Sequence, residues 1–150
     1  MARLFEVVQD NHRKHPNIDI KLPERATERS AGYDFYSPVD IVIQPNTSEL
    51  IFTDIKASMY YDNALLLFVR SSMGKHPVVI ANGTGIIDSD YYNNVDNDGN
   101  IAFRLLNLGN TPYEIKVGDR IGQGVFVKYG TIKEDKASGV RSGGIGSTGR

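Results

Sequence analysis

The apolar residues of this chain occur in short runs, each closed by a polar turn, and this spacing most restricts the possible fold. The runs have the length of β-strands: LFEVV, DIVI, ELIFTDI, ALLLFVR, PVVIA, IAFRLLNL and RIGQGVFVKY. Turn sequences such as QPNTS, NNVDNDGN and LGNTP separate them. Strands at this spacing without helical periodicity predict an all-β fold, a jelly-roll-like antiparallel barrel or sandwich. Only residues 71–76, SSMGKH, suggest a helix, so we expect at most one short helix.

The last segment, residues 134–150, differs from the rest in composition. Its sequence EDKASGVRSGGIGSTGR contains five glycines and few apolar side chains. Such a segment buries too little surface to offset the entropy of ordering it. We therefore predict a β-barrel domain at residues 1–133 and a flexible C-terminal arm at residues 134–150.

Charge and cysteine content exclude several classes of function. The chain has 17 Lys and Arg against 18 Asp and Glu, a net charge of −1, so it lacks the basic excess of a nucleic-acid-binding protein. It has no cysteine, which excludes disulfides and thiolate chemistry. No apolar run approaches the roughly 20 residues of a membrane span, and the N-terminal segment lacks a continuous apolar stretch. We expect a soluble, cytoplasmic protein with no membrane partner.

One segment imitates a calcium-binding loop. Residues 94–100, NVDNDGN, resemble the start of an EF-hand, but Leu105 stands where the bidentate glutamate belongs. A polar hairpin tip is the better interpretation. The three histidines, His12, His15 and His76, lack metal-ligand spacing and are interpreted as surface residues.

Five clusters combine glycine or serine with charge at the edges of the apolar runs: SAGYDFYSP (30–38), VRSSMGK (69–75), NGTGIIDSDYYNN (82–94), GDRIGQGVF (118–126) and GGIGSTG (143–149). In the second cluster, the guanidinium of Arg70 and the hydroxyls of Ser71 and Ser72 follow directly on a strand, an arrangement suited to an anion. Each cluster alone also has a purely structural explanation, since a strand-end aspartate often caps a turn and Arg70 could pair with a carboxylate.

Together and in this order, the five clusters resemble the five motifs of the trimeric dUTP diphosphatases (dUTPases), over nearly the whole chain. The resemblance implies hydrolysis of dUTP to dUMP and pyrophosphate by a homotrimer with shared active sites. That reaction limits uracil incorporation into DNA and supplies dUMP. It also implies Mg²⁺ as cofactor, held mostly by the triphosphate itself. No direct protein ligand is expected, and Asp34 would lie near the metal through water.

The resemblance assigns catalytic roles to two residues. Asp88 resembles the general base that activates the attacking water, and Gln123 the glutamine that helps to hold this water. Asp90 is a rival, because residues two apart on a strand point to the same side. Motif position favours Asp88, since it follows GII, and Asp90 is interpreted as a turn residue. Gln123 also fits a strand glutamine that bonds to neighbouring backbone.

Further residues match the family's substrate contacts. Tyr91 resembles the tyrosine that packs against deoxyribose and discriminates against UTP, with Tyr92 as a competing and more exposed choice. The remaining candidates fall into three groups: a phosphate site (Arg70, Ser71, Ser72, Gly74), a uracil pocket (Asn82, Gly85, Ile86, Ile87) and the arm that closes over the nucleotide, often on a neighbouring subunit (Arg141, Gly144, Ile145, Gly146, Ser147, Thr148). Many members have an aromatic residue where Ile145 stands, so we expect weaker closure.

Two alternatives remain open from the sequence. A dCTP deaminase-like enzyme of the same fold would need an additional glutamate near the third motif, and NIAFRLLNL has none. The other alternative, if the gene is phage-borne, is a regulatory protein that uses the dUTPase surface to bind a protein partner, a role that could coexist with catalysis.

Overall fold

The computed structural model describes residues 2–145. Within these residues the secondary structure consists of short strands and three 3₁₀ helices, with no α-helix. In chain order the elements are β1 (Leu4–Val7), η1 (Asp10–His12), β2 (Glu24–Arg25), β3 (Tyr33–Tyr36), β4 (Ile41–Ile43), β5 (Ser48–Phe52), β6 (Ile55–Ser58), β7 (Asn63–Phe68), η2 (Ser71–Lys75), β8 (Val78–Ile80), β9 (Gly85–Asp88), η3 (Ser89–Tyr91), β10 (Ala102–Asn107), β11 (Tyr113–Ile115) and β12 (Arg120–Lys128).

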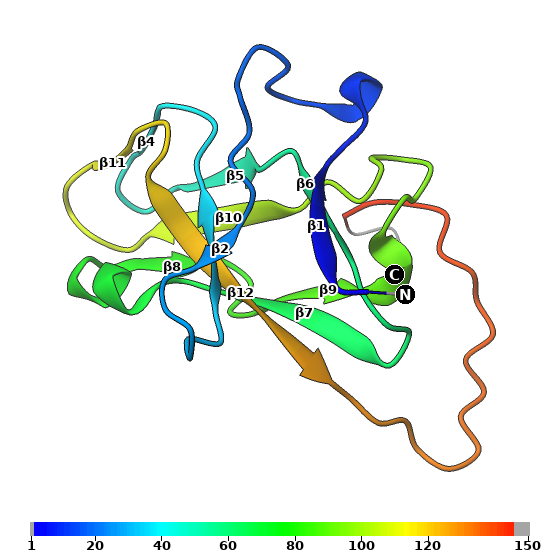
Figure 1. Cartoon of the computed structure of the whole chain (residues 1–150). Helices are drawn as coiled ribbons and strands as arrows, with labels where there is room; N and C mark the ends of the chain where they lie inside the picture. Colours follow the sequence, from blue (N-terminus) through cyan, green and yellow to red (C-terminus); the bar gives the residue numbers. More distant parts are fainter. Residues whose placement is uncertain (1, 146–150) are drawn as a thin grey trace.

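The largest sheet has five antiparallel strands in the order β2-β3-β12-β7-β9. The long strand β12 lies at its centre and pairs with β3 on one side and β7 on the other (Figure 1). Along β7 the side chains of Leu65 and Leu67 are buried while those of Leu66 and Phe68 are only partly buried. This period of two is what a strand with one face on the core requires. The edge strand β9 carries Asp88 at its end.

The opposing layer is the three-stranded sheet β5-β10-β8, and two strand pairs, β1-β6 and β4-β11, complete the fold. The two larger sheets meet through aromatic and aliphatic side chains. The rings of Phe35 (β3) and Phe103 (β10) lie 5.3 Å apart between centroids, and both side chains are buried. Phe5 of β1 adds an edge contact with Phe35 at 5.5 Å. Burial of such rings contributes the main stabilisation of the fold.

The predicted fold class is confirmed: the protein is an all-β, jelly-roll-like antiparallel structure. The predicted short helix at residues 71–76 is a 3₁₀ helix, Ser71–Lys75, and η1 and η3 are two further single turns. The apolar run 49–55 is divided into β5 and β6 by Thr53 and by Asp54, whose φ is +57°. The strands β2, β3, β9 and β11 lie outside the apolar runs that predict strands.

Residues 129–145, which follow β12, contain no helix or strand. They form a long excursion that returns to the end of β9 and to η3 (Figure 1). Within residues 2–145, no helix has the length and hydropathy that crossing a membrane requires.

Candidate active site

A pocket of about 420 Å³ opens beside the end of β9, and we call it the Asp88 pocket. Its walls combine strand backbone, aliphatic side chains and a few polar groups. The lining residues are Leu50, Leu67, Ile80, Asn82, Gly85, Ile86, Ile87, Asp88, Tyr91, Ala102, Phe103, Arg104, Arg141, Gly144 and Ile145. All four predicted uracil-pocket residues, the predicted base and three predicted arm residues therefore lie around one opening.

Asp88 owes its position to the end of the edge strand β9. Its Cα pairs with Ala64 of β7, and the chain then turns into η3, for which Asp88 is the N-cap with extended dihedral angles. The carboxylate is half exposed, at 51% of its surface. A carboxylate that is fixed at a strand end and remains open to solvent has the access that proton transfer from a water requires.

The arm places the guanidinium group of Arg141 against the carboxylate of Asp88. Nη2 of Arg141 lies 2.6 Å from Oδ2 of Asp88, and Nε lies 2.8 Å from Oδ1 of Asp90. The guanidinium also lies over the ring of Tyr91, with Cζ 5.6 Å from the centroid. The hydrogen bond to Asp90 raises the pKa of Arg141 above its ordinary value, and the charges of Asp90 and Asp88 add to this effect. Asp90 is thus more than a turn residue, because it shares Arg141 with Asp88.

Tyr91 is buried, with 5% of its surface exposed, while Tyr92 is only partly buried. The Tyr91 hydroxyl donates to the carbonyl of Asn100 at 2.9 Å and accepts from Nδ2 of Asn97 at 2.8 Å. Burial raises the pKa of this phenol above its ordinary value, partly opposed by the Asn97 hydrogen bond. The Tyr92 hydroxyl instead donates to Glu6. The structure thus presents Tyr91, rather than Tyr92, to the pocket.

A second pocket, of about 400 Å³, gathers other predicted residues, and we call it the Arg70 pocket. Nε of Arg70 donates to Oδ1 of Asp34 at 2.8 Å, and Nη1 donates to the Ser72 hydroxyl at 3.1 Å. Nη1 of Arg120 donates to Oδ2 of Asp34 at 3.2 Å. Both oxygens of this nearly buried carboxylate are thus held by guanidinium groups. Two guanidinium groups and a hydroxyl in one opening form a suitable site for an anion.

Gln123 lies near the Arg70 pocket and away from Asp88. Its Cα pairs with Asp34 of β3 and with Phe68 of β7, and its Nε2 donates to the carbonyl of Val69 at 3.2 Å. Asp88, by contrast, pairs with Ala64 near the other end of β7. Within one chain the two predicted catalytic residues therefore do not meet.

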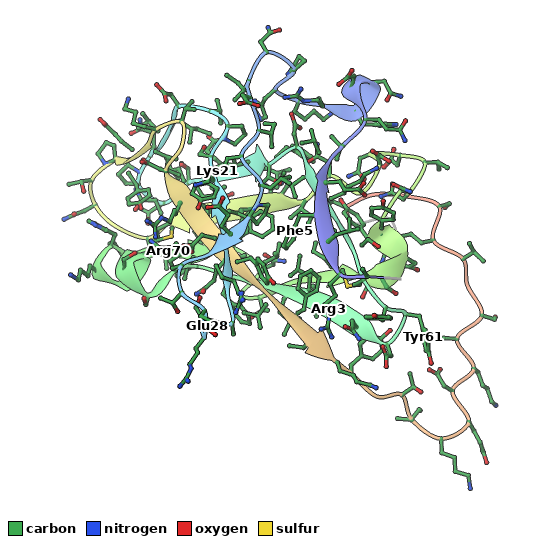
Figure 2. The ribbon with its side chains drawn as sticks, in the orientation of Figure 1. Arg3, Phe5, Lys21, Glu28, Tyr61 and Arg70 are labelled. Carbon is green, nitrogen blue, oxygen red and sulfur yellow. The ribbon has the colours of Figure 1, made fainter. Side chains whose placement is uncertain are left out.

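The predicted site residues thus form two groups in a single chain. Figure 2 shows Arg70 on the side of the molecule away from Tyr61 and the arm. Ser71 and Gly74 lie with Arg70 and Ser72, in or beside η2, and are exposed. Gly146, Ser147 and Thr148 lie outside the described residues.

The sequence reasoning missed several residues of the Asp88 pocket. Arg104 lines it from β10, between the buried Phe103 and Leu105. The alternation of that strand indicates that Arg104 points away from the core, but not which pocket it faces. The polar residues 94–100 were also misjudged as a hairpin tip, because Asn94, Asp98 and Asn100 are buried.

The described residues offer little that would hold a metal directly. Within residues 2–145, no group of three or more His, Asp or Glu side chains is arranged around a common point. Asp34 has both oxygens in hydrogen bonds with Arg70 and Arg120. Each oxygen of Asp34 therefore already has a hydrogen-bond donor within the protein.

The fold and the two pockets are typical of an all-β enzyme that acts on a small, anionic molecule. The candidate base Asp88 and the cation of Arg141 lie at one pocket, and the candidate anion site lies at the other. A family model described as dUTPase matches residues 19–149. The deoxyuridine 5'-triphosphate nucleotidohydrolase of Lactococcus lactis subsp. lactis is 39% identical over 152 residues, which cover 98% of this chain and 97% of that protein. The chain belongs to the dUTPase family.

Solved structures agree with this assignment. The crystal structure of the dUTPase from Streptococcus mutans has a TM-score of 0.74 at 33% identity and covers 86% of this chain and 98% of that one. An aspartate-to-asparagine variant of the dUTPase from phage phi11 of S. aureus has a TM-score of 0.71 at 22% identity and covers 93% of this chain and 98% of that one. That study concerns the coordination of a structural Mg(II) ion in the phage protein. At 22% identity, the likeness to the phage protein shows the fold alone.

Proposed function

We propose that the protein hydrolyses dUTP to dUMP and pyrophosphate, with the nucleoside in the Asp88 pocket. The observation that carries this proposal is the convergence of Asp88, Tyr91, the backbone of β9 and the arm's Arg141 around one opening of about 420 Å³. A pocket of this size accommodates a nucleoside. Family membership and the nucleotidohydrolase relative support the same substrate.

In this proposal the exposed edge of strand β9 recognises the uracil base. The exposed side of Gly85–Asp88 offers backbone donors and acceptors, and Asn82 adds an amide at the same opening. Ile145, at the rim, covers the base without the stacking that an aromatic residue would add. The buried ring of Tyr91 packs against the deoxyribose and leaves no room for the 2′-hydroxyl of UTP.

Asp88 acts as the general base. One of its oxygens accepts a proton from a water whose oxygen bonds to the α-phosphorus, and the bond from that phosphorus to the pyrophosphate oxygen breaks. In the free protein, Arg141 forms an ion pair with the carboxylate of Asp88. An entering triphosphate competes for the guanidinium, because phosphate oxygens bind it as well as carboxylates do. Transfer of Arg141 to the substrate frees Asp88 for the water.

We expect Mg²⁺ to enter the proposed active site bound to the phosphate oxygens of the substrate. When bound, Mg²⁺ neutralises phosphate charge and fixes the geometry of the triphosphate. Asp34 is already held by two guanidinium groups, so it suits a contact through water. Its role in the protein is then to orient Arg70 and Arg120 towards the anion.

The two pockets become one site when copies of the chain associate, and we propose a homotrimer. Asp88 and the nucleoside pocket would come from one copy, and Arg70, Ser71, Ser72, Gly74 and Gln123 from another. The proposed arm, residues 134–150, would close over the nucleotide, with Arg141, Gly144 and the segment 145–148 on the phosphates and base. Glycine-rich backbone wraps phosphates without a helix.

The experiment that tests the function is pyrophosphate release from dUTP in the presence of Mg²⁺. We expect turnover by the wild type, and a loss of about 10²- to 10⁴-fold in kcat for Asp88→Asn, because the amide cannot accept the proton. Asp40→Asn is the matched control, since Asp40 lies at the surface near Lys116 and should leave kcat unchanged. Absence of dUTP turnover by the wild type would contradict the proposal, as would an active Asp88→Asn variant.

The two alternatives are less well supported. The named relative is a nucleotidohydrolase, which favours hydrolysis over a dCTP deaminase-like reaction. The regulatory alternative stays a prediction, because the likeness to phage dUTPases at 22–23% identity shows only the fold.

A further inference from the structure

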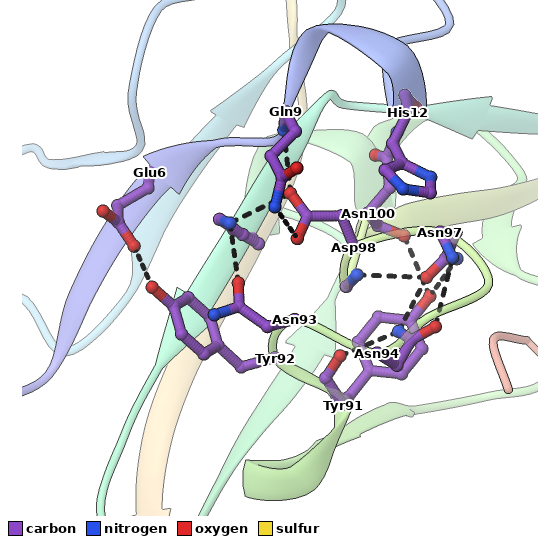
Figure 3. A network of polar contacts seen from close by, with 12 residues as sticks. Glu6, Gln9, His12, Tyr91, Tyr92, Asn93, Asn94, Asn97, Asp98 and Asn100 are labelled. Atoms are coloured by element: carbon purple, nitrogen blue, oxygen red, sulfur yellow. Dashed lines mark hydrogen bonds and ion pairs between the residues drawn. The ribbon is translucent and has the colours of Figure 1, made fainter. Parts of the chain in front are cut away.

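The turn after Tyr91 is built from side-chain hydrogen bonds, and we call residues 94–97 the asparagine loop. Nδ2 of Asn94 donates to the carbonyl of Tyr91 at 2.8 Å and to Oδ1 of Asn97 at 2.7 Å. Oδ1 of Asn94 accepts from the backbone N–H groups of Asp96 and Asn97, both at 3.1 Å. Oδ1 of Asn97 also accepts from the N–H of Gly99 at 3.1 Å. The amide of Asn97 therefore has little freedom to rotate (Figure 3).

The fixed amide of Asn97 controls the hydroxyl of Tyr91. Nδ2 of Asn97 donates to this oxygen, so the phenol directs its own proton to the carbonyl of Asn100. With its proton used in this way, the phenol has no hydrogen-bond donor to offer to a sugar hydroxyl. A 2′-hydroxyl against this ring would lose its water without gaining a partner, which disfavours a ribonucleotide.

The arm reaches the same loop from the other side. The N–H of Gly144 donates to Oδ2 of Asp96 at 3.0 Å. Gly144 is buried, and a Cβ there would lie 2.9 Å from Nδ2 of Asn97 and 2.9 Å from Oδ2 of Asp96. Only glycine therefore fits while the amide of Asn97 stays in place. Tyr91 and Gly144 of the arm thus both pack against the side chain of Asn97.

The asparagine loop is itself anchored to the body of the protein. Oδ2 of Asp98 accepts from Nζ of Lys56 at 2.9 Å, and Oδ1 of Asn93 accepts from the same ammonium at 2.7 Å. Oδ2 of Asp98 also accepts from the backbone N–H of Gln9 at 2.8 Å (Figure 3). A loop held at both ends transmits a displacement at Gly144 to Tyr91 rather than absorbing it.

We propose that Asn97 is a positioning residue that sets discrimination between deoxyribose and ribose through Tyr91, and that seating of the arm at Asp96 and Gly144 is coupled to it. This inference rests on the proposed function, because it takes the sugar of the substrate to face Tyr91. Asn97 itself does not line the pocket. It acts through the tyrosine.

The direct test is the affinity for two non-hydrolysable triphosphates, the α,β-imido analogues of dUTP and UTP, measured by calorimetry with Mg²⁺. Asn97→Asp preserves the acceptor for Asn94 and Gly99, and it replaces the donor to Tyr91 with a charged oxygen that draws the phenol proton away from Asn100. We expect the preference for the deoxy analogue to fall about tenfold, the effect of one hydrogen bond to a buried hydroxyl. In turnover, kcat for dUTP should change less than the ratio of kcat/KM between dUTP and UTP.

Asn93→Gly is the matched control in the neighbouring position. It removes the hydrogen bond to Lys56 but keeps the left-handed backbone that Asn93 has at φ +57°. This variant should retain the wild-type preference. Equal loss of preference in Asn93→Gly and Asn97→Asp would overturn the inference, since it would reflect a general loosening of the loop.

A double-mutant cycle tests the coupling to the arm. Gly144→Ala should lower the preference for the deoxy analogue about threefold to tenfold in the wild-type background, because its Cβ displaces Asn97. In an Asn97→Ala background the same change should have no further effect. Equal effects of Gly144→Ala in both backgrounds would show that the arm and Tyr91 are independent.

The outcomes separate this inference from the proposed function. If the wild type binds and turns over dUTP but Asn97→Asp keeps its preference, the inference alone is wrong. If the wild type binds neither analogue, both are wrong. Thermal unfolding of each variant checks that a changed preference belongs to a folded protein.

Discussion

At the scale of the residue, the chemistry of the Asp88 pocket depends on which partners each polar group already has. Arg141 is shared by two carboxylates, and the Tyr91 hydroxyl is bonded on both its donor and its acceptor side. At the Arg70 pocket, likewise, Asp34 holds two guanidinium groups. Tyr91 and the two guanidinium groups on Asp34 are therefore oriented before a ligand binds, which lowers the entropy lost on binding.

The raised pKa of Tyr91 predicts a pH dependence of stability. Burial is the main cause of the shift. Because the folded-state pKa lies above the unfolded value near 10, the unfolded chain releases this proton first as pH rises. The stabilisation is complete below pH 10 and is lost as pH rises from about 10 through the folded-state pKa.

Tyr91→Phe measures this contribution. The variant should be less stable than the wild type at pH 8, by about 1 to 2 kcal/mol for the lost hydrogen bonds, and the difference should shrink above pH 10. Urea unfolding at pH 8 and pH 10.5 provides the measurement. A constant difference at both pH values would contradict the assignment.

At the scale of the element, strand β12 decides the architecture, because it pairs along both edges and crosses the core. At its start the pairing with β3 shifts in register between Arg120 and Gly122. A Cβ on Gly122 would lie 2.2 Å from Cε1 of Phe103 and 2.9 Å from the carbonyl of Phe68. The strand thus approaches the opposing sheet so closely that a side chain there has no space.

Gly122→Ala should therefore destabilise the protein by about 1 to 3 kcal/mol or more, because the buried ring and the backbone cannot both give way. Gly130→Ala is the control: it lies beyond β12, where a Cβ meets nothing within 4 Å, and should change stability by less than about 0.5 kcal/mol. Denaturant unfolding of the two variants compares them. Equal stability would mean that β12 lies further from Phe103 than the structure shows.

At the scale of the whole molecule, the separation of the two pockets is the central feature. Asp88 and Gln123 are paired to β7 four positions apart along that strand, at Ala64 and Phe68, and on opposite sides of it. A single chain cannot bring both to one water. In the homotrimer that we propose, association of copies would join the two pockets without any change in fold.

Mixing two inactive variants tests this arrangement. Asp88→Asn and Gln123→Leu should each lose turnover, and co-refolding equal amounts should restore about a quarter of wild-type activity, the share of sites that combine an intact residue from each of two copies in a random mixture. Each variant refolded alone is the control. No recovery in the mixture would show that each site is formed within one chain.

The sequence alone determined the fold class and the family, and it predicts the chemistry of the site. Short alternating runs such as those of β7 and β10 predict strands because the period of two is a local property of the backbone. The order of the five motifs identified the family, and with it the candidate roles of Asp88 and Tyr91. The strands β3 and β9 escaped prediction because each has only four residues and one of them is an aspartate, with a glycine as well at the start of β9, which weakens the apolar signal.

Only the tertiary structure decided which residues meet. Arg141 contacts Asp88 across 53 positions of sequence, and Gly144 contacts Asp96 across 48. The sequence of the asparagine loop is typical of a solvated turn. In the structure, however, its Asn97 donates a hydrogen bond to Tyr91 and its Asp96 accepts one from Gly144 of the arm. Strand periodicity reports the face on which a side chain lies, but the path of the chain between strands sets its neighbours, and that path depends on packing of the whole core.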